Sequence, residues 1–272
     1  MPHIALQHGA RVHCTIDDFL WPWDRSIPVL MMHGFARNAL FWNRWVPVVA
    51  QTRRVYRPDL LGCGLSDQPP ADYRYTPETI GAQIIAVLDG LSLERVHWVG
   101  ESSGGIIGLM LAAACPERIA SLTLCNTPTR IPDRIKQIYA LDKESASAAM
   151  RAYGVGEWCR QTLQYRLDME HASPPLCEWV ISEMDRTPPE VAAAMHDCFE
   201  AVDTVPVLPR IAAPVLLLSG DKSPIASAQQ QTFASTLPNG RVAAIAGVGH
   251  GVNLLQPERC AQLAADFFGS IE

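Results

Sequence analysis

The sequence lacks several features that define whole classes of protein. It has no run of about 18 or more apolar residues, so we expect no transmembrane helix. Its N-terminus lacks a basic segment followed by an apolar stretch, so we expect no signal peptide and a cytoplasmic location. No C-x-x-C pair occurs, which argues against zinc and thioredoxin-like sites. In a reduced cytoplasm the eight cysteines are expected to be free thiols: Cys14, Cys63, Cys115, Cys125, Cys159, Cys177, Cys198 and Cys260.

Charge is also scarce. Only 18% of the residues are charged and the net charge is −6, with acids and bases scattered along the chain. A nucleic-acid or anionic-membrane partner would need a basic face, so we expect neither. Hydrophobic residues make up 48% of 272 positions, which suffices for the large core of one α/β domain with an insertion. The sequence leaves open whether the chain forms a homodimer.

Short apolar runs alternate with helical patterns, which is typical of a mostly parallel sheet covered on both faces. The strands are expected at residues 11–16, 29–32, 54–57, 96–99, 122–125, 215–219 and 242–245. The helices are expected at residues 40–50, 77–88, 103–114, 226–237 and 257–268. Thr76 before Pro77 is a helix N-cap followed by proline at the first helical position.

The stretch from 127 to 209 has no strand-like run and carries helical patterns separated by prolines. A structureless loop of this length is rare in a compact domain, so we interpret the segment as a helical lid. The core domain would then comprise residues 1–126 and 210–272.

The most informative motif is Gly100-Glu101-Ser102-Ser103-Gly104, which follows an apolar strand and opens a helix. A nucleophilic serine on such a sharp turn sits in a strained conformation that lifts its hydroxyl above the sheet. Side chains two residues before and after would collide there, which explains the two glycines. Ser103 lacks glycine two residues before it, so the motif indicates Ser102 as the nucleophile.

These motifs resemble the α/β-hydrolase superfamily, in its subgroup of lidded esterases, lactonases and C–C hydrolases. The resemblance also rests on three further segments, which read VLMMHGF from Val29, RPDLLGCGLS from Arg57 and GVGH from Gly247. It implies an α/β-hydrolase fold with a mostly parallel eight-stranded sheet and flanking helices. It also implies an oxyanion hole built from the amides of Phe35 and Ser103, each worth on the order of 3 kcal/mol of barrier.

His250 lies in a glycine-rich loop between an expected strand and helix. Such a loop lets an imidazole approach the serine, and the order serine then histidine fits the family, so we predict His250 as the general base. Six other histidines lie on expected elements or near the N-terminus, and we interpret them as structural or surface residues: His3, His8, His13, His97, His171 and His196.

The third catalytic residue departs from the family pattern. The usual acid position holds Ser223, and the only acid in that loop is Asp221, which reaches His250 only if the loop backbone is shifted. Some relatives place the acid before the lid, where this chain has Asn126. An asparagine can orient an imidazole but adds no negative charge. Asp221 is the candidate that we carry forward, with Asn126, Asp203 or no residue as alternatives.

The lid contains aromatic and methionine residues at helical spacing, which more often serve its own packing than a substrate wall. Some must face Ser102, and we predict Trp158 and Trp179 as substrate-binding residues, with Phe35 and Trp42 opposite them. Arg130 and Arg134 could bind a carboxylate, although solvated surface arginines are commoner.

The sequence thus predicts a serine esterase or lactonase acting on a small, mainly hydrophobic substrate through an acyl-enzyme on Ser102. No metal or organic cofactor is implied. The alternatives are a C–C bond hydrolase or hydroxynitrile-lyase-type enzyme on the same fold, and a ligand receptor with slow turnover.

Overall fold

An eight-stranded sheet forms the centre of the computed structural model, which describes residues 2–222 and 227–271. The strand order is β1-β2-β4-β3-β5-β6-β7-β8; β2 pairs antiparallel with β1 and β4, and the other neighbours are parallel. This confirms the predicted fold class. The strands are β1 (His3–Ala5), β2 (Arg11–Asp17), β3 (Val29–Met32), β4 (Val55–Pro58), β5 (Val96–Glu101), β6 (Ile119–Cys125), β7 (Val215–Gly220) and β8 (Gly240–Ile245).

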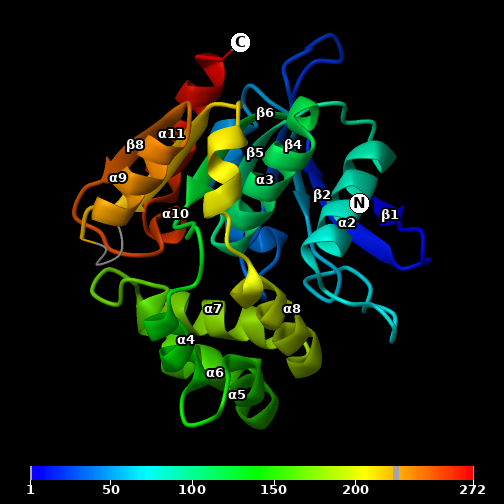
Figure 1. Ribbon diagram of the computed structural model, residues 1–272. Helices are drawn as coiled ribbons and strands as arrows, with labels where there is room; N and C mark the ends of the chain where they lie inside the picture. Colours follow the sequence, from blue (N-terminus) through cyan, green and yellow to red (C-terminus); the bar gives the residue numbers. More distant parts are fainter. Residues whose placement is uncertain (1, 223–226, 272) are drawn as a thin grey trace.

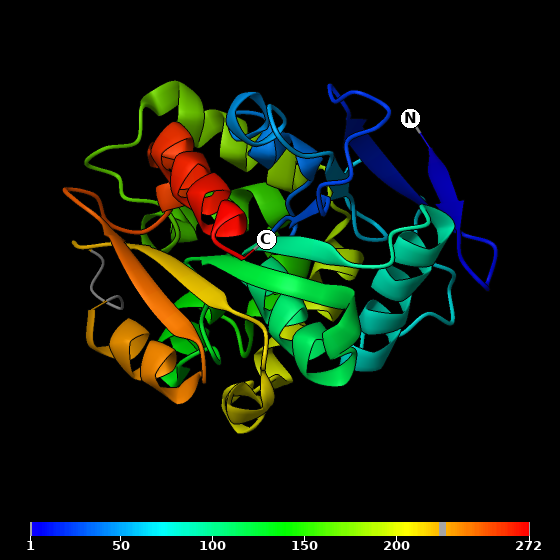
Figure 2. The ribbon, with the colours of Figure 1, turned by 90° about the horizontal axis from the view of Figure 1, so that it is seen from above.

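Helices cover both faces of the sheet (Figure 2). Because side chains alternate along a strand, Leu30 and Met32 face one helical layer while Val29 and Met31 face the other. The central strands β3, β5, β6 and β7 are buried along their whole length, which explains their continuous apolar runs. The first layer contains α2 (Pro77–Gly90), α3 (Ser103–Ala114) and α9 (Ser227–Thr236), and the second contains α1 (Val46–Val49) and α11 (Pro257–Gly269).

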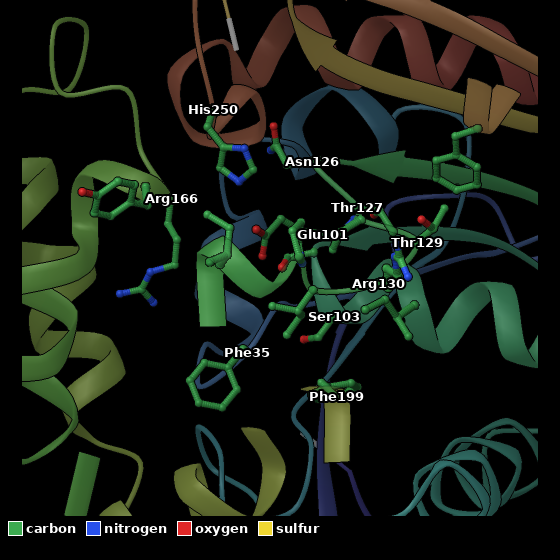
Figure 3. A pocket seen from close by; sticks show the side chains of 18 of the residues that line it. Phe35, Glu101, Ser103, Asn126, Thr127, Thr129, Arg130, Arg166, Phe199 and His250 are labelled. Carbon is green, nitrogen blue, oxygen red and sulfur yellow. The ribbon is translucent and has the colours of Figure 1, made fainter. Parts of the chain in front are cut away.

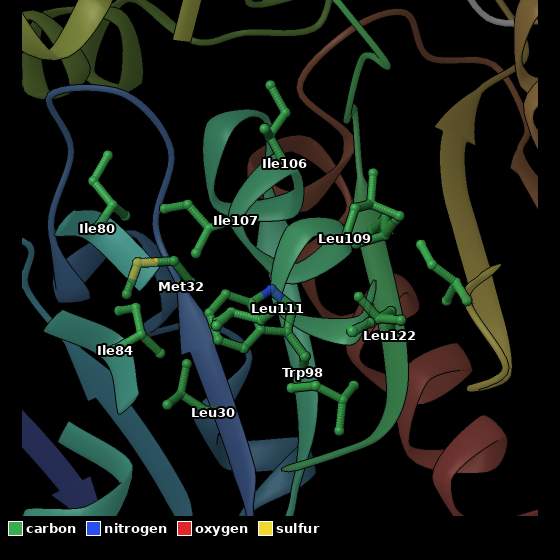
Figure 4. Close-up of a cluster of buried hydrophobic side chains, with 14 of the residues drawn as sticks. Leu30, Met32, Ile80, Ile84, Trp98, Ile106, Ile107, Leu109, Leu111 and Leu122 are labelled. Atoms are coloured by element: carbon green, nitrogen blue, oxygen red, sulfur yellow. The ribbon is translucent and has the colours of Figure 1, made fainter. Parts of the chain in front are cut away.

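The larger apolar cluster lies between the sheet and the layer of α2 and α3 (Figure 4). Trp98 is buried at its centre, and its indole Nε1 donates to the carbonyl of Gly104 at 3.0 Å. A Cβ at Gly108 would lie 2.4 Å from that indole nitrogen. This packing anchors the start of α3 directly beneath the Ser102 turn.

Local signals placed most elements correctly. Thr76 caps α2 in a reciprocal hydrogen-bonded box with Thr79, as its position before Pro77 predicts. All eight cysteines are free thiols, as expected, and seven of them are buried. Strand β1 was not predicted, because three residues are too few to show the alternation of apolar and polar side chains that marks a strand. The helix expected at 226–237 has its first residue outside the described part of the chain.

The helix expected at residues 40–50 is wrong. Two short elements stand there instead, η1 (Ala39–Trp42) and α1. Proline at position 47 has no N–H with which to continue a helix from residue 43, so the chain turns between the two elements.

The segment between β6 and β7 is helical and gathers below the sheet in Figure 1. We call residues 127–209 the lid segment. It packs largely on itself, around Trp158, Val180 and Met184. Its helices are α4 (Asp133–Ala140), α5 (Ala146–Tyr153), α6 (Val155–Thr162), η3 (Leu163–Tyr165), α7 (Pro174–Asp185), α8 (Pro189–Ala201) and η4 (Val205–Arg210). Across the described residues, no helix combines the length and apolar character needed to cross a membrane.

Candidate active site

Ser102 occupies the turn between β5 and α3 in a strained conformation. Its φ of 50° and ψ of −116° lie in a region that residues other than glycine rarely adopt. A Cβ at Gly100 would lie 2.6 Å from backbone atoms of Gly104, and a Cβ at Gly104 would lie 2.4 Å from the carbonyl oxygen of Met32. Both glycines are therefore required by close backbone contacts, and the turn has the geometry that the motif predicts.

Two residues that line the same cavity as Ser102, Phe35 and Ser103, have backbone amides without an acceptor among the described residues. Within the described residues, neither the Phe35 N–H nor the Ser103 N–H donates a hydrogen bond. The Phe35 loop is held by His33, whose Nε2 accepts from the Leu60 amide at 3.0 Å and whose Nδ1 donates to the Gly34 carbonyl at 2.7 Å. Burial lowers the pKa of His33, which keeps the ring neutral for this role.

A cavity of about 660 Å³ lies between the core and the lid segment (Figure 3). Its size is typical of small-molecule sites. Most of the predicted residues line it: Phe35, Ser102, Ser103, Asn126, Arg130, Trp158 and His250.

Two predicted wall residues lie elsewhere. Trp179 is absent from the described lining of the cavity and packs on Phe41, with ring centroids 4.6 Å apart. Trp42 is buried against Trp45, in the apolar cluster between the sheet and the layer of α1 and α11. Helical spacing identifies an apolar face but not the layer that it packs against, so this part of the prediction was wrong.

The imidazole of His250 makes no hydrogen bond to any described residue, although it lines the same cavity as Ser102. Burial lowers its pKa to about 4, and the positive charges of Arg37 and Arg166 add to this shift. The ring is therefore neutral at pH 7, which is the form that a general base requires.

Asp221 does not lie against His250. Its carboxylate is exposed, and Oδ1 accepts a hydrogen bond from the Gly247 amide at 2.8 Å. The structure thus corrects the predicted role of Asp221, because this contact stabilises the turn after β8 instead. Ser223, at the usual acid position, lies outside the described residues. Asp203 lines the cavity, but its carboxylate accepts from the Val205 amide.

The side chain of Asn126 contacts the segment that follows His250. Its Oδ1 accepts from the Gly251 amide at 3.3 Å, and its Nδ2 donates to Asn253 at 3.2 Å. Figure 3 shows the Asn126 side chain beside the His250 ring. Asn126 thereby positions the segment that carries the imidazole.

Asp168 in the lid segment also holds this loop, which sequence reasoning missed. Its Oδ2 accepts from the Gly249 amide at 2.7 Å, and its own amide donates to the His250 carbonyl at 2.9 Å. The side chains of Asp168, Glu170 and His171 lie close enough together to hold a metal ion. However, Asp168 Oδ2 is already hydrogen-bonded to the Gly249 amide and to the His171 ring. No sequence signal connects Asp168 to a histidine so far along the chain.

Glu101 and Arg37 form a second unpredicted feature, a buried ion pair next to Ser102. Glu101 Oε2 lies 3.0 Å from Arg37 Nη1, and both side chains line the cavity. Burial raises the pKa of Glu101, whereas the Arg37 charge lowers it. A Cβ at Gly34 would overlap the Glu101 carboxylate, which explains the glycine after His33.

Replacing Asp221 by asparagine separates the two interpretations of this residue. The new side-chain amide oxygen would still accept from the Gly247 amide, so we expect Asp221→Asn to lower kcat less than about threefold. Loss of a true triad aspartate would lower kcat by roughly 10⁴-fold. Steady-state ester hydrolysis measures the difference, and a collapse at Asp221→Asn with the fold intact would restore it as the catalytic acid.

The family is established by sequence. A model of the alpha/beta hydrolase fold family matches residues 27–257, and the chain therefore belongs to this family. The structure resembles the enol-lactonase from Burkholderia xenovorans LB400, with a TM-score of 0.86, 23% identity, and coverage of 98% of this chain and 100% of that one. This likeness supports the fold.

Two curated relatives share part of the sequence. A 2-hydroxymuconate semialdehyde hydrolase from Pseudomonas sp. (strain CF600) is 40% identical over 105 residues, which cover 38% of this chain and 37% of that protein. A cis-3-alkyl-4-alkyloxetan-2-one decarboxylase from Shewanella oneidensis is 37% identical over 134 residues, covering 48% of this chain and 40% of that protein. Both matches span less than two thirds of the relative's own length.

Proposed function

We propose that this chain is a serine hydrolase that cleaves a small, mainly hydrophobic carboxylic ester or lactone. One observation carries the proposal: a serine on a strained turn shares a cavity with a neutral histidine and two unpaired amides. These are the parts that acyl transfer needs, namely a nucleophile, a base and donors for an oxyanion.

In the proposed reaction, His250 takes the proton from the Ser102 hydroxyl as its oxygen attacks the substrate carbonyl. The amides of Phe35 and Ser103 stabilise the resulting oxyanion. The bond to the leaving oxygen then breaks, and that oxygen receives the proton from His250. Water, deprotonated by His250, attacks the acyl-enzyme, which releases the acid and restores Ser102.

The cavity walls support a mainly hydrophobic substrate. Most of the exposed surface of the cavity wall is apolar, and it includes the side chains of Ile106, Ile131, Tyr139, Trp158 and Phe199 from the core and the lid segment. The Shewanella relative is named for an oxetan-2-one, which is a cyclic ester. The apolar wall favours a hydrophobic substrate, and the name of this relative, a decarboxylase, favours a lactone as the bound group.

A C–C bond hydrolase is the second candidate. The observation that favours it is the 40% identity to a 2-hydroxymuconate semialdehyde hydrolase over 105 residues. A serine, a histidine and an oxyanion hole serve both reactions, so the substrate decides between them.

Activity on matched substrates tests the proposal. We expect purified protein to hydrolyse p-nitrophenyl acetate and butyrate, and a fluorophosphonate to label Ser102, as read by peptide mass spectrometry. A parallel screen with β-diketones and vinylogous C–C substrates should give slower turnover. Turnover of the C–C substrates alone would favour the second candidate, and tight ligand binding without turnover or labelling would indicate a receptor.

A further inference from the structure

Arg166 lines the cavity and has a buried guanidinium nitrogen that no described protein group pairs with. It follows η3 in the lid segment, and Figure 3 shows its side chain extending along the lid side of the pocket, across from Glu101 and Phe35. Its Nη2 donates to Thr162 Oγ1 at 2.7 Å and to the Cys159 carbonyl at 3.4 Å, and its Nη1 contacts the Met184 sulfur. Its Nε is buried and has no partner among the described residues.

Arg166 is also a cation without a direct ion-pair partner among the described residues, although its charge acts on the buried Glu101 carboxylate and lowers the pKa of that group. Among the described residues no carboxylate oxygen lies within 4.0 Å of it, whereas Arg37 in the same cavity is paired with Glu101. Its guanidinium carbon lies 4.4 Å from the Trp158 ring centroid and 5.6 Å from that of Tyr139. The two rings hold the group in place but do not neutralise its charge.

His196 on α8 lines the same region and is unsatisfied as well. It is 3% exposed, and neither ring nitrogen makes a hydrogen bond to any residue that the structure describes. Its Nδ1 lies 3.4 Å from Glu200 Oε2 without hydrogen-bond geometry. Its ring lies 6.1 Å from both Tyr139 and Trp158, the same two rings that contact Arg166.

Buried polar groups are nearly always hydrogen-bonded, because leaving one unpaired costs about 1–3 kcal/mol. Two such groups from separate lid elements, facing one cavity across the same pair of rings, need a common explanation. A bound ligand that accepts hydrogen bonds and carries negative charge satisfies both groups.

We propose that Arg166 and His196 form a carboxylate-binding subsite in the lid segment, so that the substrate carries a carboxylate remote from its scissile bond. An arginine binds a carboxylate through charge and parallel N–H groups, and a neutral imidazole adds one N–H donor. The inference rests on the proposed ester or lactone hydrolysis and deepens it: the substrate is mainly hydrophobic with one anionic end.

The test compares pairs of p-nitrophenyl esters with equal shape and different charge. The glutarate half-ester is paired with the 5-methylhexanoate ester, and the adipate half-ester with the 6-methylheptanoate ester. In each pair an isopropyl group replaces the carboxylate. The measured quantity is the ratio of kcat/KM for the anionic ester to that for its neutral partner, after subtraction of the rate with Ser102→Ala protein.

We expect the wild-type ratio to exceed one for at least one spacer length. Arg166→Met should lower that ratio by about tenfold or more, and His196→Phe should lower it by a smaller factor. Arg160→Met is the matched control, because it removes an exposed lid charge paired with Glu178 away from the cavity and should leave the ratio unchanged. A wild-type preference for the neutral ester at both lengths, or an unchanged ratio in Arg166→Met, would overturn the subsite.

A binding measurement separates this inference from the proposed function. We expect calorimetry with glutarate or adipate to show binding to Ser102→Ala protein, weakened at least tenfold by adding Arg166→Met. If neither ester is hydrolysed but this Arg166-dependent binding is present, the subsite stands and the hydrolase proposal fails. If esters are hydrolysed without charge preference and no dicarboxylate binds, the subsite fails and the hydrolase proposal stands. Should Arg166→Met not fold, Arg166→Gln gives the same comparison, because it also removes the charge but keeps a polar side chain.

Discussion

Ser102→Ala should lower kcat/KM for p-nitrophenyl butyrate by roughly 10⁴-fold or more while leaving the fold intact. In the proposed reaction, the substitution removes the atom that forms the acyl-enzyme, whereas the amides and His250 remain. The strained backbone at Ser102 is imposed by close contacts around Gly100 and Gly104, and these do not involve the serine hydroxyl. Alanine can therefore occupy the same turn.

Ser103→Ala provides the neighbouring comparison for this measurement. It leaves the Ser103 amide in place and removes a buried hydroxyl that has no partner among the described residues, so we expect a loss of less than about tenfold. Circular dichroism and thermal unfolding verify that each variant is folded. A folded Ser102→Ala protein with wild-type turnover, or a collapse at Ser103→Ala alone, would show that Ser102 is not the nucleophile.

The pH profile of kcat/KM should have its acid limb near pH 4 instead of near the usual pKa of histidine, 6.5. Only the neutral imidazole accepts the Ser102 proton, so activity is lost as the pH falls through the pKa of the folded protein. At pH 5 a base with a pKa of about 4 is roughly 90% active. A base with an unshifted pKa would be only about 3% active there, a difference of roughly 30-fold.

Arg166→Met tests one of the two charges that add to the effect of burial on the pKa of His250. Arg166 is one of two charges that lower the pKa of His250, so the variant's acid limb should move to higher pH. A neutral ester is used so that substrate charge does not interfere, and product is measured chromatographically. Aliquots returned to about pH 7.5, where a neutral imidazole is the active form, reveal any acid inactivation. A wild-type midpoint near the usual histidine pKa, or a midpoint that Arg166→Met does not move, contradicts this account of the base.

The sequence by itself determined the parts that depend on local geometry. The serine turn was predictable because its glycines are needed by contacts within a few residues and against the adjacent strand. The buried strands followed from their apolar runs, and the start of α2 from the Thr76 cap. The glycine-rich loop predicted a histidine near Ser102, and His250 lines the same cavity. In each case the physical requirement lies in neighbouring residues, so the sequence displays it directly.

Only the tertiary structure decided which distant side chains meet. Asp221 has the right chemistry for the third catalytic position, yet the turn after β8 brings it to the Gly247 amide. Asp168 contacts the His250 loop because the lid segment packs there, and the same packing turns Arg166 toward the cavity and Trp179 away from it. Helical patterns are alike for a lid's own core and for a substrate wall, since periodicity records which residues share a face and not what that face contacts.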